Sequence, residues 1–461
     1  MNYKSILTSV LGIASVTAVL HAQQRPNIVY IMGDDLTYTD IGCYGGVNSI
    51  TPNIDRLAEE GLRFLNCHQT APMCSPTRQN LLTGLYPVRN GAYPNHSWVY
   101  EGTKSIAHYL MDLGYNVGLQ GKRHIGSVES FPFNYFDSRK MDIDTSLFSS
   151  FIAESVQSNT PFALFLMSNH PHGNSWSREL GDESLFDADK LVLPPHFIDT
   201  PETREIYVKY LAAMNYLDQE VGMVIQTLKK HGVYDDNTLV MFASEQGHSW
   251  PFAKWTLYSE GLQSALIARW PGHIKAGTTT NAMVEYVDFT PTMIEAAGGK
   301  AVAGLDGVSF FPVLLGAKDT HKEYTYGIMT SRGINQGPDY YGIRSVYDGR
   351  YRYILNLTPE VEFNNVLTRG NNIGAVFFNS WRREAKTNEF ARERVTKYQW
   401  RPAEELYDRQ NDQYELINLA DDPQYIEIKR HLQTKLAAWM QQQGDVGQLT
   451  ELRASERQQR N

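Results

Sequence analysis

Cysteine is scarce in this chain, which has only Cys43, Cys67 and Cys74 among 461 residues. Three cysteines are too few for a disulfide framework. Because Cys74 lies in a chemical motif described below, Cys43 and Cys67 remain, either as buried thiols or as one disulfide. Hydrophobic residues make up 42% of the chain, which predicts a globular protein with one large α/β domain and a smaller appendage.

Positive charge is also in short supply. The 42 lysines and arginines are outnumbered by 51 aspartates and glutamates, so the formal net charge is −9. This balance argues against nucleic acid as a partner and against a broad basic surface for long polyanions. An anionic substrate would therefore have to be held by a local cationic pocket.

Long hydrophobic runs are absent apart from one near the start, from Ile6 to Leu20, which follows Lys4. This run is short for a membrane span and has the pattern of a secretory signal. We expect a signal peptide over residues 1–22, cleaved after Ala22, and an exported, periplasmic protein without a membrane span.

Four short apolar runs predict buried strands. They cover residues 27–32, 116–120, 162–167 and 238–242. Helical patterns lie between them, most clearly at residues 51–61 and 206–231. Strands that alternate with helices predict an α/β fold with a mostly parallel sheet covered on both faces.

The pattern changes after about residue 300. Residues 341–355 predict a hairpin around Asp348-Gly349. Residues 426–443 predict an amphipathic helix that Gly444 ends, and the tail from Ser455 has the composition of a disordered segment. We expect a catalytic domain over residues 23–330 and a smaller C-terminal α+β subdomain over residues 331–461.

Polar residues follow each of the four predicted strands. They are Asp34 and Asp35, Lys122 and His124, His170 and His172, and Glu245 and Gln246. Because ligands of such sheets bind beyond the carboxyl ends of the strands, we expect these four segments to form one site.

The segment Cys74-Ser75-Pro76-Thr77-Arg78, followed by Thr83-Gly84, is the most distinctive stretch. One interpretation is structural, a helix start with Ser75 as N-cap and Pro76 in the first turn, beside a buried cysteine. The other is chemical, with Cys74 as the precursor of a nucleophile. The two are compatible, because the free N–H groups of a helix N-terminus stabilise an anionic intermediate.

These residues resemble the formylglycine-dependent sulfatases of the alkaline-phosphatase-like superfamily. The likeness runs from Arg25-Pro26-Asn27 to Glu405-Leu406-Tyr407-Asp408. It implies the fold of that superfamily, a sulfatase activity and a sulfated saccharide substrate. It also implies a maturation enzyme that reads the motif before folding and oxidises Cys74 to formylglycine.

The resemblance assigns roles to the polar residues. A calcium ion would be bound by Asp34, Asp35, Glu245, Gln246 and the modified Cys74. Glu245-Gln246 depart from the family, which usually has Asp followed by Asn or His there. Each side chain is one methylene longer and still offers an oxygen to a hard cation, so we expect the metal site to survive.

The remaining matches supply cations and proton carriers. Lys122, Lys254 and Arg78 would neutralise charge on the sulfuryl group. His172 is the expected general acid to the leaving group and His124 the base that expels sulfate, although the two roles could be exchanged.

Within the superfamily, the likeness is closest to the heparan N-sulfatase (N-sulfoglucosamine sulfohydrolase) branch. Residues 121–126 leading to Phe131-Pro132-Phe133, the run 405–412 and residues 436–439 carry it. The first expected substrate is therefore N-sulfoglucosamine, with O-sulfated sugars next. His96 and His170 fall near catalytic segments and are candidates for sugar contacts.

Two other functions fit the sequence less well. A phospho- or phosphonate-ester hydrolase of the same superfamily with two metals would need further His and Asp ligands, where this chain has Lys122 and Lys254. A glycan-binding relative without catalysis would be expected to have lost Cys74 or Arg78, and both are present.

Overall fold

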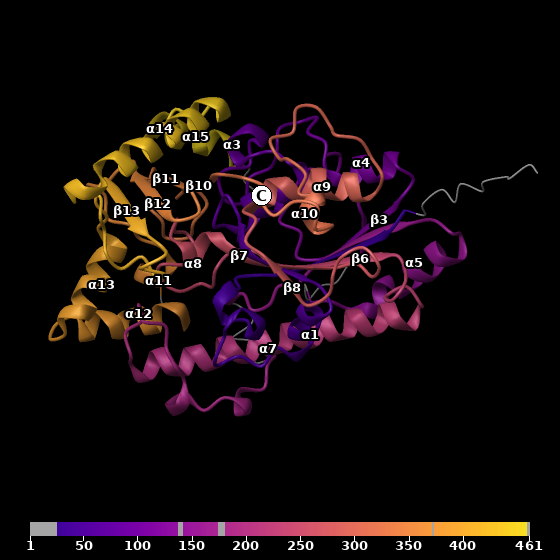
Figure 1. Ribbon diagram of the computed structural model, residues 1–461. Coiled ribbons are helices and arrows are strands. Elements are labelled where there is room, and N and C mark those ends of the chain that lie inside the picture. Colours follow the sequence, from indigo (N-terminus) through magenta and orange to yellow (C-terminus); the bar gives the residue numbers. More distant parts are fainter. Residues whose placement is uncertain (1–24, 137–141, 174–179, 371–372, 459–461) are drawn as a thin grey trace, which may run out of the picture.

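A large sheet with helices on both faces forms the centre of the computed structural model, which describes residues 25–136, 142–173, 180–370 and 373–458 (Figure 1). Within these residues, nine strands join it in the order β4-β3-β5-β1-β6-β7-β2-β8, and β9 also pairs with β2. The strands are β1 (Asn27–Gly33), β2 (Leu62–His68), β3 (Asn116–Gly121), β4 (Asn134–Phe136), β5 (Phe162–Met167), β6 (Thr238–Ser244), β7 (Gln263–Arg269), β8 (Thr278–Thr280) and β9 (Val284–Glu285). Only β7 runs antiparallel to its neighbours, β6 and β2, so the sheet is mostly parallel as predicted.

Alternate residues of β1 feed two separate cores, because successive side chains of a strand point to opposite faces. Val29 and Ile31 pack with α1 (Pro52–Glu59), α5 (Thr145–Gln157) and α7 (Pro201–Lys230). Tyr30 and its neighbours on the other face pack with α2 (Cys74–Thr83), α4 (Ile106–Asp112) and α9 (Phe289–Ala296). Figure 1 shows the two layers, with α4 and α9 above the sheet and α1, α5 and α7 below it.

The four predicted strands are confirmed as β1, β3, β5 and β6. The predicted helix at residues 206–231 begins earlier, at Pro201. Thr200 caps it, since its side chain accepts a hydrogen bond from Thr203 N, and Pro201 supplies the favoured first residue. The predicted signal peptide lies outside the described residues. Within those residues, no helix is both long and apolar enough to cross a membrane.

A second, antiparallel sheet follows in the chain, in the order β10-β11-β12-β13. Its strands are β10 (Thr325–Thr330), β11 (Gly342–Tyr347), β12 (Tyr351–Asn356) and β13 (Glu404–Asp408). The predicted hairpin is confirmed as β11 and β12, and Gly349 in its turn has φ 96°, which favours glycine. The division of the chain at residue 330 stays a prediction, and β10 lies on the N-terminal side of it.

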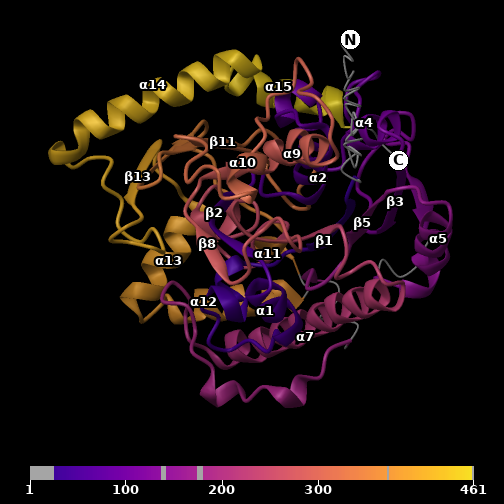
Figure 2. The same cartoon turned by 45° about the vertical axis from the view of Figure 1, so that its right-hand side comes forward.

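Helices cover this second sheet. The long helix α14 (Ile426–Gln443) matches the predicted range and ends at Gly444, which has φ 72°. It packs on β11 and β12, and Figure 2 shows it crossing above that sheet. The remaining helices are α3 (Pro87–Asn90), α8 (Ser259–Leu262), α10 (Phe311–Leu314), α11 (Val366–Arg369), α12 (Ile373–Glu384), α13 (Glu389–Gln399), α15 (Gln448–Arg457) and the 3-10 turns 38–40, 42–44, 183–185, 188–190, 286–288 and 423–425.

The predicted disorder from Ser455 is wrong for residues 455–457, because α15 continues to Arg457. The Arg457 guanidinium donates to Gly91 O and Trp98 O, each at 3.0 Å, and lies 4.0 Å from the ring centre of Tyr100. These contacts hold the end of the chain against a segment far away in sequence.

Candidate active site

The nucleophile candidate Cys74 is the first residue of α2, which follows β2 after the loop of residues 69–73. Every residue of α2 is buried, and Met73 is its N-cap. The prediction that Ser75 is the N-cap is wrong, because Ser75 is the second helical residue. Its hydroxyl donates to Ser97 O at 3.2 Å. The helix N-terminus still faces the site, as expected for binding an anion.

Four acidic or thiol side chains meet at this edge of the sheet. Ligand atoms of Asp34, Asp35, Cys74 and Glu245 all lie within 4.8 Å of one another, and all four residues are buried. The strands set this geometry, because Asp34 and Asp35 follow β1 and Glu245 follows the neighbouring β6, with Glu245 N donating to Gly33 O at 2.7 Å.

Two lysines neutralise this cluster. Lys122 Nζ forms an ion pair with Asp34 and lies 3.5 Å from Cys74 Sγ, while Lys254 Nζ lies 2.7 Å from Asp35 Oδ2. Burial opposes ionisation of the Cys74 thiol, but Lys122 and Lys254 outweigh it and hold the pKa of Cys74 well below its ordinary value. The site therefore stabilises negative charge at the side chain of Cys74.

Arg78 lies one turn beyond Cys74 along α2 and is completely buried. Its Nε is 2.6 Å from Glu245 Oε1, and its Nη1 donates to Lys122 O at 2.6 Å. Arg78 thereby ties together the segments that follow β3 and β6, in addition to the predicted role near Cys74.

Three of the predicted histidines line the cavity above Cys74. The rings of His96 and His124 meet edge to face with centroids 5.4 Å apart, and His172 Nε2 lies 3.6 Å from Asp35 Oδ2. Burial lowers the pKa of His124 to about 4, so its ring is neutral at neutral pH.

His170 requires a correction. It is fully buried, does not line the cavity, and its Nε2 lies 2.8 Å from Asp142 Oδ1. Its backbone carbonyl accepts a hydrogen bond from Asp34 N at 2.8 Å. The position of His170 therefore suits support of the loop that carries His172, and excludes the predicted sugar contact in this conformation.

The cavity has a volume of about 240 Å³ and several walls that the sequence did not reveal. Asn95, Asn169 and Trp255 adjoin predicted residues, so their neighbours His96, His170 and Lys254 were the available signal. The segment Gly333–Asn335 also lines the cavity, and it carried no signal because it follows β10 of the second sheet.

Close backbone contact fixes this wall. Asn95 N donates to Arg332 O at 3.1 Å, and Asn95 Nδ2 donates to Gly333 O at 3.5 Å. Gly333 has φ 84°, and a Cβ there would lie 2.2 Å from Asn95 O, so only glycine fits.

The acidic cluster has the donors that a calcium ion needs. Glu245 Oε2 and Gln246 Oε1 are buried and, among the described residues, have no hydrogen-bond partner. Gln246 Nε2 donates to Asp35 Oδ1 at 2.5 Å, so rotation of the amide would turn its oxygen toward the same carboxylate. Oxygen ligands in this number suit a hard cation such as Ca²⁺, so the residues fit the predicted metal.

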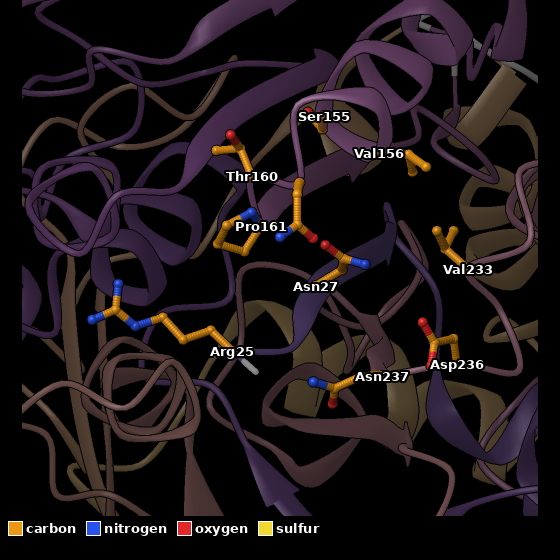
Figure 3. Close-up of a pocket in the computed structure, with 10 residues that line it drawn as sticks. Arg25, Asn27, Ser155, Val156, Thr160, Pro161, Val233, Asp236 and Asn237 are labelled. Carbon is orange, nitrogen blue, oxygen red and sulfur yellow. The ribbon is translucent and has the colours of Figure 1, made fainter. Parts of the chain in front are cut away.

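Another cavity of about 250 Å³ lies at the opposite, amino-terminal edge of the sheet (Figure 3). Arg25, Asn27, Pro161 and Asn237 are among its lining residues, and no predicted site residue reaches it. The two remaining cysteines do not line the cavity above Cys74. Cys43 and Cys67 are free thiols and form no disulfide.

Comparison with known proteins shows the family to which this chain belongs. The sulfatase family model matches residues 26–299, which is more than half of the chain. The chain belongs to the sulfatase family. It is accordingly a hydrolase of sulfuric esters or sulfamates, on the alkaline-phosphatase-like fold. A second model, "N-sulphoglucosamine sulphohydrolase, C-terminal", matches residues 246–365.

Two relatives of this sulfatase are similar over most of their length. An ulvan-active sulfatase of Formosa agariphila is 32% identical over 92% of this chain and 81% of its own. Human N-sulphoglucosamine sulphohydrolase is 27% identical over 92% of this chain and 91% of its own.

Solved structures share the fold. One, in complex with its substrate D-glucosamine-2-N,6-O-disulfate, has a TM-score of 0.67 and 20% identity, covering 92% of this chain and 99% of its own. A phosphonate monoester hydrolase of Agrobacterium radiobacter has a TM-score of 0.68 and 18% identity, covering 91% and 96%. At these identities the fold alone is shared, and the family match favours sulfatase over the phosphonate-ester alternative.

Proposed function

We propose that this sulfatase releases sulfate from a saccharide of a sulfated glycan, with Cys74 converted to formylglycine as the nucleophile. The observation that carries the proposal is the position of Cys74, at the floor of a small cavity between Lys122 and the carboxylates of Asp34 and Asp35. Cys74 is only 3% exposed, so an oxidising maturation enzyme would have to act on the segment before it folds.

The proposed reaction begins from the hydrated aldehyde, which carries two hydroxyl groups on one carbon. One hydroxyl oxygen attacks sulfur and gives up its proton to the carboxylate of Asp34, whose Oδ1 lies 3.7 Å from Cys74 Sγ. The bond from sulfur to the leaving oxygen or nitrogen breaks, and His172 donates the proton that the leaving group takes. His124 then removes the proton of the second hydroxyl, whose electrons expel sulfate and restore the aldehyde. Water adds to the aldehyde and completes the cycle.

Charge neutralisation is the second part of the proposal. Lys122 and Lys254 would bind the oxygens of the sulfuryl group, and Arg78 would hold Glu245 in place beneath them. Calcium, when bound by Asp34, Asp35, Glu245, Gln246 and the modified residue 74, would supply further positive charge there.

The first proposed substrate is a terminal N-sulfated glucosamine. Two findings support it, the match to the C-terminal model of N-sulphoglucosamine sulphohydrolase and the similarity to the human enzyme over nearly the whole chain. A cavity of about 240 Å³ is smaller than the pockets of roughly 300–1,000 Å³ that enclose drug-sized ligands, which favours one terminal sugar over an internal unit.

An O-sulfated sugar is the second candidate, because an N-acetylglucosamine-6-O-sulfatase of Bacteroides thetaiotaomicron is 26% identical over 63% of this chain. A panel of defined sulfated mono- and disaccharides, assayed for sulfate release with matured enzyme, separates the two. Release from N-sulfated glucosamine supports the first. Release from O-sulfated sugars alone would replace it and leave the sulfatase activity in place.

A further inference from the structure

A second polar hollow lies where the two sheets meet, with a volume of about 460 Å³. It is bounded by β2 and β7 of the large sheet, by the β11–β12 hairpin and by the segment after β13. It shares no lining residue with the cavity above Cys74. Within the residues that the structure describes, its lining includes no cysteine, carboxylate or histidine, which suits binding rather than catalysis.

The chemistry of its wall is unusual for an acidic protein. Among its lining residues, all within the described part of the chain, there is no carboxylate, and one is a cation, Arg409. Two tyrosines, Tyr38 and Tyr347, supply aromatic surface. Side-chain amides supply most of the rest, at Asn66, Gln263, Asn281, Gln410 and Gln413.

Arg409 is held rigidly at this wall. Its Nη1 donates to Gln263 Oε1 at 2.7 Å, its guanidinium carbon lies 5.6 Å from the ring centre of Tyr347, and its side chain is 8% exposed. Its Nε is buried and makes no hydrogen bond among the described residues, lying 3.9 Å from Glu415 Oε1. The buried Nε is out of a ligand's reach, so an anion in the hollow would be bound by the terminal nitrogens of this guanidinium, which also interacts with Tyr38.

Arg409 shares its counter-charge with a second arginine. Arg352 pairs with Glu415 at 2.9 Å, so two guanidiniums share one carboxylate, which also accepts hydrogen bonds from Ser259. Burial raises the pKa of nearby Glu260 to about 8, which leaves that group protonated at neutral pH. Burial, with the charges of Arg352 and Arg409, also lowers the pKa of His68 well below its ordinary value.

We propose that this hollow is a second, non-catalytic binding site for an acidic saccharide unit, whose sulfate or carboxylate group is bound by Arg409. A guanidinium suits such an anion because its planar donors match two oxygens at once. Amide side chains donate to and accept from sugar hydroxyls, and tyrosine rings pack on the apolar face of a sugar. The saccharide identity rests on the proposed function, whereas the anion site rests on Arg409 alone.

Binding measurements on the full chain with Cys74→Ala, which cannot turn substrate over, test this site. The probes are a heparin-derived and an ulvan-derived sulfated tetrasaccharide, and a neutral tetrasaccharide, each titrated by calorimetry. Gln413→Trp fills the hollow from an exposed position, and Gln441→Trp, exposed on α14 and outside both cavities, is its matched control.

We expect two binding events for a sulfated tetrasaccharide, one of which Gln413→Trp weakens at least about tenfold, or ~1.4 kcal/mol, while Gln441→Trp changes neither. The neutral probe should not bind at the second site. Unchanged binding in Gln413→Trp, equal binding of the neutral probe, or binding of neither sulfated probe would overturn the inference.

Turnover distinguishes this failure from failure of the proposed function. In chains that keep Cys74, Gln413→Trp should hydrolyse a small aryl sulfate at the unaltered rate. Loss of hydrolysis in the unmutated, matured enzyme would refute the proposed reaction, whatever the calorimetry shows.

Discussion

Arg78 and Glu245 form an ion pair in which both side chains are wholly inaccessible to solvent, with Arg78 Nε 2.6 Å from Glu245 Oε1. Residue 78 comes from α2, the helix that begins at Cys74, and residue 245 follows the central strand β6. The pair therefore couples this helix to the carboxylate cluster.

Removing one partner of this buried pair should be costly. Glu245→Gln leaves a buried guanidinium without its main counter-charge, and we expect a loss of about 3–5 kcal/mol in the free energy of unfolding. Urea unfolding measures it. Arg56→Gln is the matched control, because Arg56 and Glu60 are also 2.6 Å apart but Arg56 is 68% exposed, so its unfolding midpoint should stay unchanged. Equal midpoints for wild type and Glu245→Gln would contradict this account.

Cys74→Ala should abolish sulfate release, by at least about 10⁴-fold, because no other group replaces a covalent nucleophile. Cys43→Ala, at a free thiol outside the site, should retain activity. Mass spectrometry of the peptide that contains residue 74 should show formylglycine in active enzyme. Full activity with an unmodified thiol would exclude formylglycine as the nucleophile.

Calcium removal should lower stability as well as activity. A ligand that binds only the folded chain stabilises it by about 2.7 kcal/mol at 100 times its Kd, so dialysis against a chelator should lower the melting temperature, and added calcium should restore it. Asp34→Asn should remove this calcium-dependent shift. Stoichiometric zinc by elemental analysis, with activity kept in chelator, would refute the calcium assignment.

The general acid can be identified through the leaving group. His172→Ala should slow hydrolysis of a sulfamate far more than that of an aryl sulfate, because only a poor leaving group needs a proton in the transition state. His431→Ala, exposed on α14, is the control. Equal losses on the two substrates would remove His172 from this role.

Glu220, buried on α7, should make stability depend on pH. Burial raises the pKa of Glu220 to about 7 from 4.5, so the folded chain holds a proton that the unfolded chain releases. The contribution of protonated Glu220 to the free energy of unfolding is complete below pH 4.5. It is lost as the pH rises to about 7, so the free energy of unfolding falls by roughly 3 kcal/mol in total. Glu220→Gln should remove this part of the dependence in urea unfolding from pH 4.5 to 7.5, whereas Glu205→Gln, exposed on the same helix, should leave it intact.

Much of the fold and most of the site could be predicted because the signals were local. Buried parallel strands have continuous apolar runs, and the polar residues at their carboxyl ends must meet at one edge, as Asp34, Lys122 and Glu245 do. The direction of a side chain in a loop depends on contacts with distant segments. His170 is buried for this reason, with its ring against Asp142. The wall at Gly333 and the anchoring of Arg457 depend on contacts between distant segments, which no periodicity encodes.

The contact between Asn95 and Gly333 joins residues that are 238 positions apart. Residues 34–245 thus include Cys74 and its carboxylates, and the segment after β10 supplies a wall of the same cavity. A chimera that exchanged only the second sheet with another sulfatase would keep its reaction and change its substrate specificity. Recombination of the segment that encodes the second sheet would therefore change the substrate, without any change to the residues that break the bond.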